Sequence, residues 1–209
     1  MTAAYADSVF INCPFDEEYR PLFRAIVFTI HDAGFVPRCS LELSDASEDR
    51  MSKIVRLIQE CRFGIHDISR TEPNEHGLPR FNMPFELGLF IGCRRYGGKR
   101  QGSKSCLVLD RERYRYQAFL SDIAGNDVDA HQGEPKVAVK RVRDWLRTAS
   151  ARTTIPGSAR IWKRYERFEH DLPSLCEAIG LDIEDLAFAD YSNVIVQWLK
   201  KNAPRSPAP

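Results

Sequence analysis

Several patterns that would identify a common class of protein are missing from this sequence of 209 residues. The six cysteines form no CxxC pair and show no zinc-ligand spacing, so we expect buried, reduced thiols. The five histidines include no HExxH motif, which argues against a metal site. Neither a GxGxxG nor a P-loop signature occurs, so Rossmann dehydrogenases and P-loop NTPases are disfavoured. The sequence therefore predicts no metal and no resident cofactor.

Charge and hydropathy argue against two further classes. Thirty basic and 29 acidic side chains leave a net charge of +1, which gives no general reason for nucleic-acid binding. No run approaches the roughly 18 apolar residues of a membrane span. Residues 1–7 lack the basic region and apolar core of a secretory signal, so we expect a cytoplasmic protein with no membrane partner. The basic segment 94–104 could contact nucleic acid, but a solvated loop is the simpler interpretation.

What the sequence does contain is an alternation of apolar strands and amphipathic helices. Apolar runs bounded by turn residues predict strands at 8–12, 35–43, 63–68 and 105–109. Helical spacing of apolar residues predicts helices at 17–33, 50–60, from 82 onward and at 137–148. Strands separated by helices of this length form βαβ units, so the predicted fold class is α/β with a mainly parallel sheet flanked by helices.

The character of the chain changes after residue 147. The segment 148–158 is rich in Ser, Thr, Gly and Pro, and it precedes a region that reads as purely helical. We predict two helices there, at 159–178 and 182–201, with breaks at Pro173 and Gly180. We expect an α/β domain at 1–147 and a helical extension at 148–209, either a cap on that domain or an interaction module. The Pro-rich tail 203–209 is predicted to be disordered.

One carboxylate interrupts an otherwise apolar helix. Glu86 follows Asn82, a good N-cap, and Pro84, which a first helical turn tolerates. We therefore expect Glu86 in the first turn, where the helix dipole and unpaired N–H groups favour its ionised form. A capping glutamate without a chemical role is the alternative interpretation.

Polar side chains also follow two of the predicted strands directly. They are Asn12 and Asp16 at and after the end of the first strand, with Pro14 between them, and Asp67, Ser69 and Arg70 at the end of the third. Ligands of open α/β sheets bind at the carboxyl ends of strands. Ordinary N-capping of the next helix explains the polar residues at either strand end alone. Because both strand ends and Glu86 carry such residues, we predict a pocket at one edge of the sheet.

These segments resemble the TIR-like and nucleoside 2-deoxyribosyltransferase-like superfamily over about residues 8–147. The stretch from Asn82 to Gly88 is similar to the Asn-x-x-x-Glu-Leu-Gly segment that opens the helix bearing the family's catalytic glutamate. Glu86 matches that glutamate, and Asp67 resembles the aspartate at the preceding strand end. The resemblance implies a flavodoxin-like or TIR-like sheet with this site at its edge.

The first-strand loop carries a second part of the resemblance. Pro14 and Phe15 resemble the Gly-Pro-Phe-like turn that lines the nucleoside pocket of the deoxyribosyltransferases, although Cys13 stands where that turn has glycine. Those transferases also carry an aspartate just before their glutamate, where this chain has Arg80 or Asn82. That departure argues against a housekeeping transferase.

The resemblance implies cleavage of an N-glycosidic bond, in which Glu86 stabilises or attacks the electron-poor C1′. NAD needs no strong acid because nicotinamide leaves readily, whereas a purine would require protonation by Asp67 or His66. Arginine suits phosphate recognition, so arginines join the candidate contacts. The predicted catalytic residues are Glu86 and Asp67, and the predicted substrate-binding residues are Asn12, Pro14, Phe15, Asp16, Asn82, Ser69, Arg50 and Arg70.

We therefore expect an N-glycosidase that cleaves NAD or a related nucleotide as an antiphage defence effector. Such an enzyme needs control, so we expect a homo-oligomer or a regulatory protein partner that contacts the C-terminal helices. A non-catalytic TIR-like module that binds nucleotides or scaffolds a complex is one alternative. A nucleoside deoxyribosyltransferase is the other.

Overall fold

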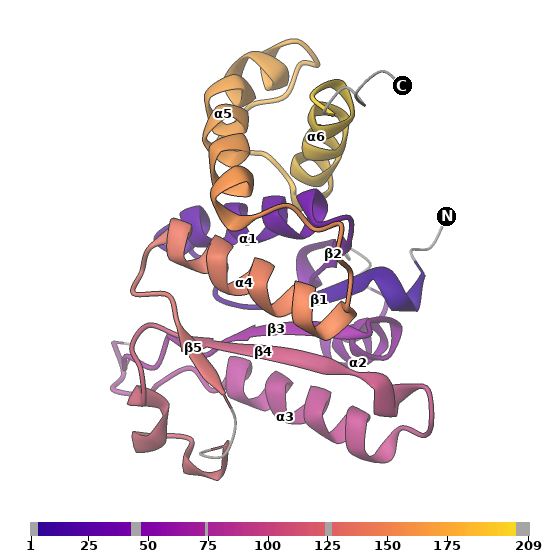
Figure 1. Ribbon diagram of the computed structural model, residues 1–209. Coiled ribbons are helices and arrows are strands. Elements are labelled where there is room, and N and C mark those ends of the chain that lie inside the picture. Colours follow the sequence, from indigo (N-terminus) through magenta and orange to yellow (C-terminus); the bar gives the residue numbers. More distant parts are fainter. Residues whose placement is uncertain (1–3, 43–46, 74, 124–126, 204–209) are drawn as a thin grey trace.

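A parallel sheet forms the centre of the computed structural model, which describes residues 4–42, 47–73, 75–123 and 127–203 (Figure 1). The sheet has the strand order β2-β1-β3-β4-β5, and every neighbouring pair is parallel. The strands are β1 (Ser8–Asn12), β2 (Val36–Arg38), β3 (Phe63–Asp67), β4 (Ser105–Asp110) and β5 (Val128–Ala130). The chain runs outward from β1 to β2 and then, beyond β3, in the opposite direction. The order thus reverses between β1 and β3, where ligands of such sheets bind.

Helices cover both faces of the sheet, which confirms the predicted α/β class (Figure 1). The helices α1 (Arg20–Asp32) and α4 (Pro135–Ser150) pack together on one face, and α2 (Arg50–Glu60) and α3 (Asn82–Tyr96) pack together on the other. Because helices cover both sides, every residue of β1 and β3 is buried.

Two further helices form an outer layer on α1: α5 (Ser158–Glu177) and α6 (Phe188–Lys201) (Figure 1). The ring of Phe28 in α1 lies with its centroid 5.3 Å from that of Phe168 in α5 and 6.0 Å from that of Trp198 in α6. These side chains belong to the same buried cluster as those of β1, β3 and α4. The C-terminal helices therefore share the core of the α/β part, and the predicted boundary at 147 falls inside α4, which ends at Ser150.

Two predicted elements near the N-terminus are too long. The helix predicted from residue 17 begins only at Arg20, because Asp16 Oδ1 accepts the Tyr19 N–H at 2.9 Å and holds the preceding residues in a turn. The strand predicted at 35–43 ends at Arg38. A 3-10 turn at Ser40–Glu42 follows it, and Pro37 removes one ladder donor.

The C-terminal half also differs from the prediction. Pro173 does not break α5, which runs on to Glu177 because the neighbouring turns bury Leu172 and Cys176. The second C-terminal helix begins at Phe188 rather than residue 182. The three-residue strand β5 was missed, since so short a segment carries almost no periodic signal.

The basic segment 94–104 was expected to be a solvated loop, and only part of it is exposed to solvent. Lys104 is 2% exposed, and its Nζ donates hydrogen bonds to the carbonyl oxygens of Ile58 and Cys61 at the end of α2. It therefore satisfies backbone groups that the helix end leaves unpaired. Of the predicted disordered tail at 203–209, residues 204–209 lie outside the described residues. None of the helices in the described ranges has both the length and the apolar character needed to cross a bilayer.

Candidate active site

The carboxyl end of β1, the loop after it and the starts of α2 and α3 enclose a cavity of about 230 Å³, here called the Glu86 cavity. It lies at the point where the strand order reverses. Seven of the predicted site residues line it: Glu86, Asn12, Pro14, Phe15, Asp16, Asn82 and Arg50. The other three, Asp67, Ser69 and Arg70, do not.

Glu86 lies one residue further into α3 than the sequence predicts. The helix begins at Asn82, after Phe81 as the N-cap, so Asn82 is not a cap and Glu86 is past the first turn. Burial raises the pKa of Glu86 to about 7, and the positive charge of Arg50 only partly opposes this. The expected preference for the ionised form is therefore wrong, because loss of solvent outweighs the helix dipole at this depth. Among the described residues, no hydrogen bond or salt bridge engages the Glu86 carboxylate.

Asn12 holds the helix that carries Glu86 against the sheet. Its Nδ2 donates to the carbonyl oxygen of Met83 in the first turn of α3 at 2.9 Å and lies 3.1 Å from His66 Nδ1. Both amide hydrogens thus have protein acceptors, which leaves only Oδ1 for the predicted contact with the substrate. Asn12 is therefore a positioning residue as well as part of the cavity wall.

His66 is unsuited to the predicted role of proton donor. Burial lowers its pKa to about 3, and the positive charge of Lys104 adds to the effect. Its Nδ1 accepts from Asn12, so the neutral ring carries its proton on Nε2, which has no hydrogen-bond partner in the described ranges. The ring packs against Phe90, with centroids 4.9 Å apart, and a Cβ on Gly64 would lie 2.7 Å from both side chains.

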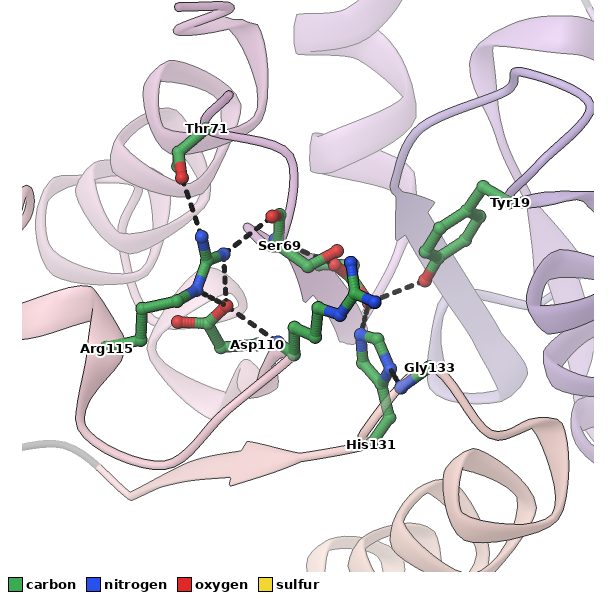
Figure 2. A network of polar contacts seen from close by, with 9 residues as sticks. Tyr19, Ser69, Thr71, Asp110, Arg115, His131 and Gly133 are labelled. Carbon is green, nitrogen blue, oxygen red and sulfur yellow. Dashed lines mark hydrogen bonds and ion pairs between the residues drawn. The ribbon is translucent and has the colours of Figure 1, made fainter. Parts of the chain in front are cut away.

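Asp67 ends β3 and is fully buried outside the Glu86 cavity, in a network whose members Tyr19, Ser69 and His131 are labelled in Figure 2. Its Oδ2 accepts the Tyr19 hydroxyl at 2.6 Å, and its Oδ1 accepts the Ser69 N–H at 2.9 Å. His131 Nε2 is 3.1 Å from the same Oδ2, close enough for an ion pair although no hydrogen bond forms. His131 Nδ1 accepts the Gly133 N–H at 2.9 Å, so the proton of a neutral ring lies on Nε2 and faces Asp67. The Asp67 carboxylate is thus occupied by the protein itself.

The same network continues to the end of β4 (Figure 2). Arg115 donates from Nε to Asp110 Oδ1 at 3.0 Å, from Nη1 to the Thr71 hydroxyl at 2.8 Å and from Nη2 to the Ser69 carbonyl at 2.6 Å. Burial raises the pKa of Asp110, and Arg115 works against that rise. Ser69, predicted to bind substrate, therefore hydrogen-bonds to Asp67 at the end of β3 and to Arg115 after β4, and links the segments that follow these two strands.

The predicted phosphate-binding arginines have different surroundings. Arg70 donates to Asp16 at 2.9 Å and to Glu18 at 2.7 Å, in a hollow of about 500 Å³ next to the Glu86 cavity. Arg50 is exposed at the start of α2, on the rim of the cavity. Arg80, which the prediction left without a role, lines both hollows. Arg50 and Arg80 thus place two positive charges on the wall of the Glu86 cavity, and within the described structure neither forms a salt bridge with Glu86.

Four residues of the buried network were absent from the predicted site: Tyr19, Asp110, Arg115 and His131. Asp110 had a usable signal, since it directly follows an apolar strand as Asp67 does, but the predicted strand stopped one residue short. Tyr19 and His131 reach Asp67 across 48 and 64 positions of sequence, and no local pattern reveals such contacts.

No protein-family model matches the chain, and no curated protein matches it. The resemblance to the TIR-like and deoxyribosyltransferase-like superfamily therefore stays a prediction. Within the described parts of the chain, no group of three His, Cys, Asp or Glu side chains is arranged to hold a metal ion.

Proposed function

We propose that the Glu86 cavity cleaves the N-glycosidic bond of NAD or a related nucleotide. One observation carries the proposal: Glu86 is 7% exposed and faces a cavity at the strand-order reversal with no partner for its carboxylate among the described residues. A buried carboxylate normally has hydrogen bonds or a counter-charge, because its desolvation is costly. A cationic ligand group would supply that partner.

The chemistry follows from the charge that develops during cleavage. As the C1′–N bond breaks, the electron pair leaves with the base and positive charge grows on the ribose ring. The Glu86 carboxylate stabilises that charge strongly in a water-poor cavity, or adds to C1′ to form a glycosyl ester. Water then attacks C1′, which breaks the ester bond to Glu86 where one has formed, and releases a proton to solvent, which leaves the free ribose hydroxyl.

The lack of a proton donor favours a substrate with a cationic base. His66 is neutral, with a pKa lowered to about 3, and Asp67 is occupied by Tyr19 and Ser69. Neither protonates a purine in the Glu86 cavity. Nicotinamide is bound to ribose as a pyridinium and leaves as a neutral molecule, so it needs no proton. The positive pyridinium also favours ionisation of Glu86 when the substrate binds.

The proposal also covers phosphate binding, the cellular role and the control of the enzyme. Arg50 and Arg80 on the rim suit the phosphates of a nucleotide. The protein acts in the cytoplasm as an antiphage effector, restrained by self-association or by a regulatory partner on α5 and α6. Exposed basic residues from Arg94 to Arg100 offer a site for a nucleic-acid signal.

The test is base release by the purified chain, at low and high protein concentration, from NAD, NADP, ATP and deoxynucleosides. Glu86→Gln keeps the shape of the side chain and removes its charge, so we expect nicotinamide release to fall by at least about 10³-fold. Glu112→Gln, at an exposed glutamate, is the control for loss of one negative charge.

Three results would contradict the proposal. Full activity of Glu86→Gln would show that the Glu86 carboxylate takes no part in the reaction. Nucleotide binding without base release at any protein concentration would favour the non-catalytic module. Transfer of deoxyribose between bases, with no release from NAD, would favour the deoxyribosyltransferase.

A further inference from the structure

A second cavity adjoins the Glu86 cavity on the side of the C-terminal helices. It has a volume of about 130 Å³ and lies between the start of α1 and the segment that leads into α6. Phe15 and Asp16 line both cavities. A ligand in one is therefore separated from a ligand in the other only by the loop between β1 and α1.

The walls of this second cavity are aromatic and aliphatic. The rings of Phe15 and Phe23 meet edge to face with centroids 5.4 Å apart, and Phe23 lies 5.9 Å from Phe188. Phe15 is 37% exposed and Leu41 is 47% exposed, so part of this apolar lining is not covered by other side chains. Apolar and aromatic walls of this kind are typical of sites for flat organic rings.

A few polar groups stand among the apolar walls. Arg20 lies 3.0 Å from Glu17 and 3.6 Å from Glu184, and Asp16 also lines the cavity. Carboxylates accept hydrogen bonds from amino and hydroxyl groups, and an arginine donates to ring nitrogens or phosphate. A small number of convergent polar groups in an apolar pocket is what orients a ligand.

We propose that this cavity binds the second base of a dinucleotide whose reacting ribose occupies the Glu86 cavity. The inference rests on the proposed function for the reacting half of the substrate. The two nucleosides lie on either side of Phe15, and the diphosphate that joins them passes the loop near Arg80 and Arg50. A mononucleotide fills only the Glu86 cavity.

The inference gives the C-terminal extension a part in substrate selection. Ile183, Leu186 and Phe188, which line the second cavity, come from the segment between α5 and α6 and from the start of α6. The α/β part supplies the reacting carboxylate, and the extension supplies part of the wall that distinguishes a dinucleotide from a mononucleotide.

The test compares NAD with nicotinamide mononucleotide as substrates of the full chain. Leu41→Asp places a charge in the second cavity at an exposed position outside the Glu86 cavity. We expect its KM for NAD to rise about tenfold, the usual cost of losing an apolar pocket contact, with the KM for the mononucleotide unchanged. Ile179→Asp is the matched control, since Ile179 is 54% exposed and lines neither cavity.

A binding measurement separates this inference from the proposed function. Calorimetry with adenosine monophosphate on Glu86→Gln needs no turnover, and we expect binding that Leu41→Asp weakens and Ile179→Asp does not. Equal KM values for NAD and the mononucleotide in the wild type would overturn the inference. So would adenosine monophosphate binding that Leu41→Asp leaves intact, even if Glu86 proves to be catalytic.

Discussion

Two buried carboxylates near the same edge of the sheet have opposite surroundings. Asp67 is fully buried and is held by the Tyr19 hydroxyl, the Ser69 N–H and His131. Glu86 is 7% exposed, has no comparable partner among the described residues, and has its pKa raised to about 7 by burial. One carboxylate thus stabilises the arrangement of the strand ends, while the other destabilises the fold when it ionises.

The same functional group thus has two uses, a structural one at Asp67 and, as proposed, a chemical one at Glu86. A carboxylate with three protein partners has little freedom to move and less capacity to accept hydrogen bonds from a ligand. A carboxylate without partners keeps its charge available, and the fold tolerates the cost of its burial. Mutations at the two positions should therefore change stability in opposite directions.

The largest effect is expected at Asp67. Asp67→Ala leaves the Tyr19 hydroxyl and the Ser69 N–H unpaired in the interior, so we expect the free energy of unfolding to fall by about 3–5 kcal/mol. Urea denaturation followed by circular dichroism measures the change. Asp67→Asn keeps an acceptor oxygen and should lose less, and Asp122→Ala, at an exposed aspartate, should lose almost nothing. A loss at Asp67 no greater than at Asp122 would contradict the structural role.

At Glu86 the expected change has the opposite sign. Its pKa rises from the ordinary 4.5 to about 7 in the folded state, so between these values the folded protein holds a proton that the unfolded chain has lost. Stability from this group is complete below pH 4.5 and is lost as the pH rises to about 7. Glu86→Gln should therefore match the wild type in acid and be more stable by about 3 kcal/mol near pH 8. Equal stability at both pH values would show that Glu86 is not buried as described.

The smallest expected effect is in the pH dependence of the reaction. Only ionised Glu86 stabilises positive charge, so kcat/KM for NAD should rise about tenfold per pH unit in acid and level off above about 7. Stopped assays of nicotinamide release across this range measure it. Arg50→Ala removes the charge that lowers the pKa of Glu86, so the midpoint should move upward by less than about one unit. A kcat/KM that does not change with pH would show that the rate does not depend on ionisation of Glu86.

Much of the fold was predictable because its signals are local. The helix α2 was predicted with the observed limits because its apolar residues follow helical spacing, and the structure adds Asp49 as its N-cap. The cavity was predictable because Asn12 and Glu86 lie at strand-to-helix corners of neighbouring strands. The environment of each group was not predictable, because it depends on distant residues. Tyr19 and His131 contact Asp67, and burial under the surrounding elements raises the pKa of the glutamate that was expected to be ionised.

The contacts of Phe28 with Phe168 and Trp198 also affect how the protein is made. A ribosome delivers α1 long before α5 and α6, so the apolar outer face of α1 stays uncovered until α6 has left the exit tunnel. A chain that stops before α6 keeps that face exposed, and chaperones and proteases act on such species. We therefore expect incomplete copies to be degraded faster than the full chain.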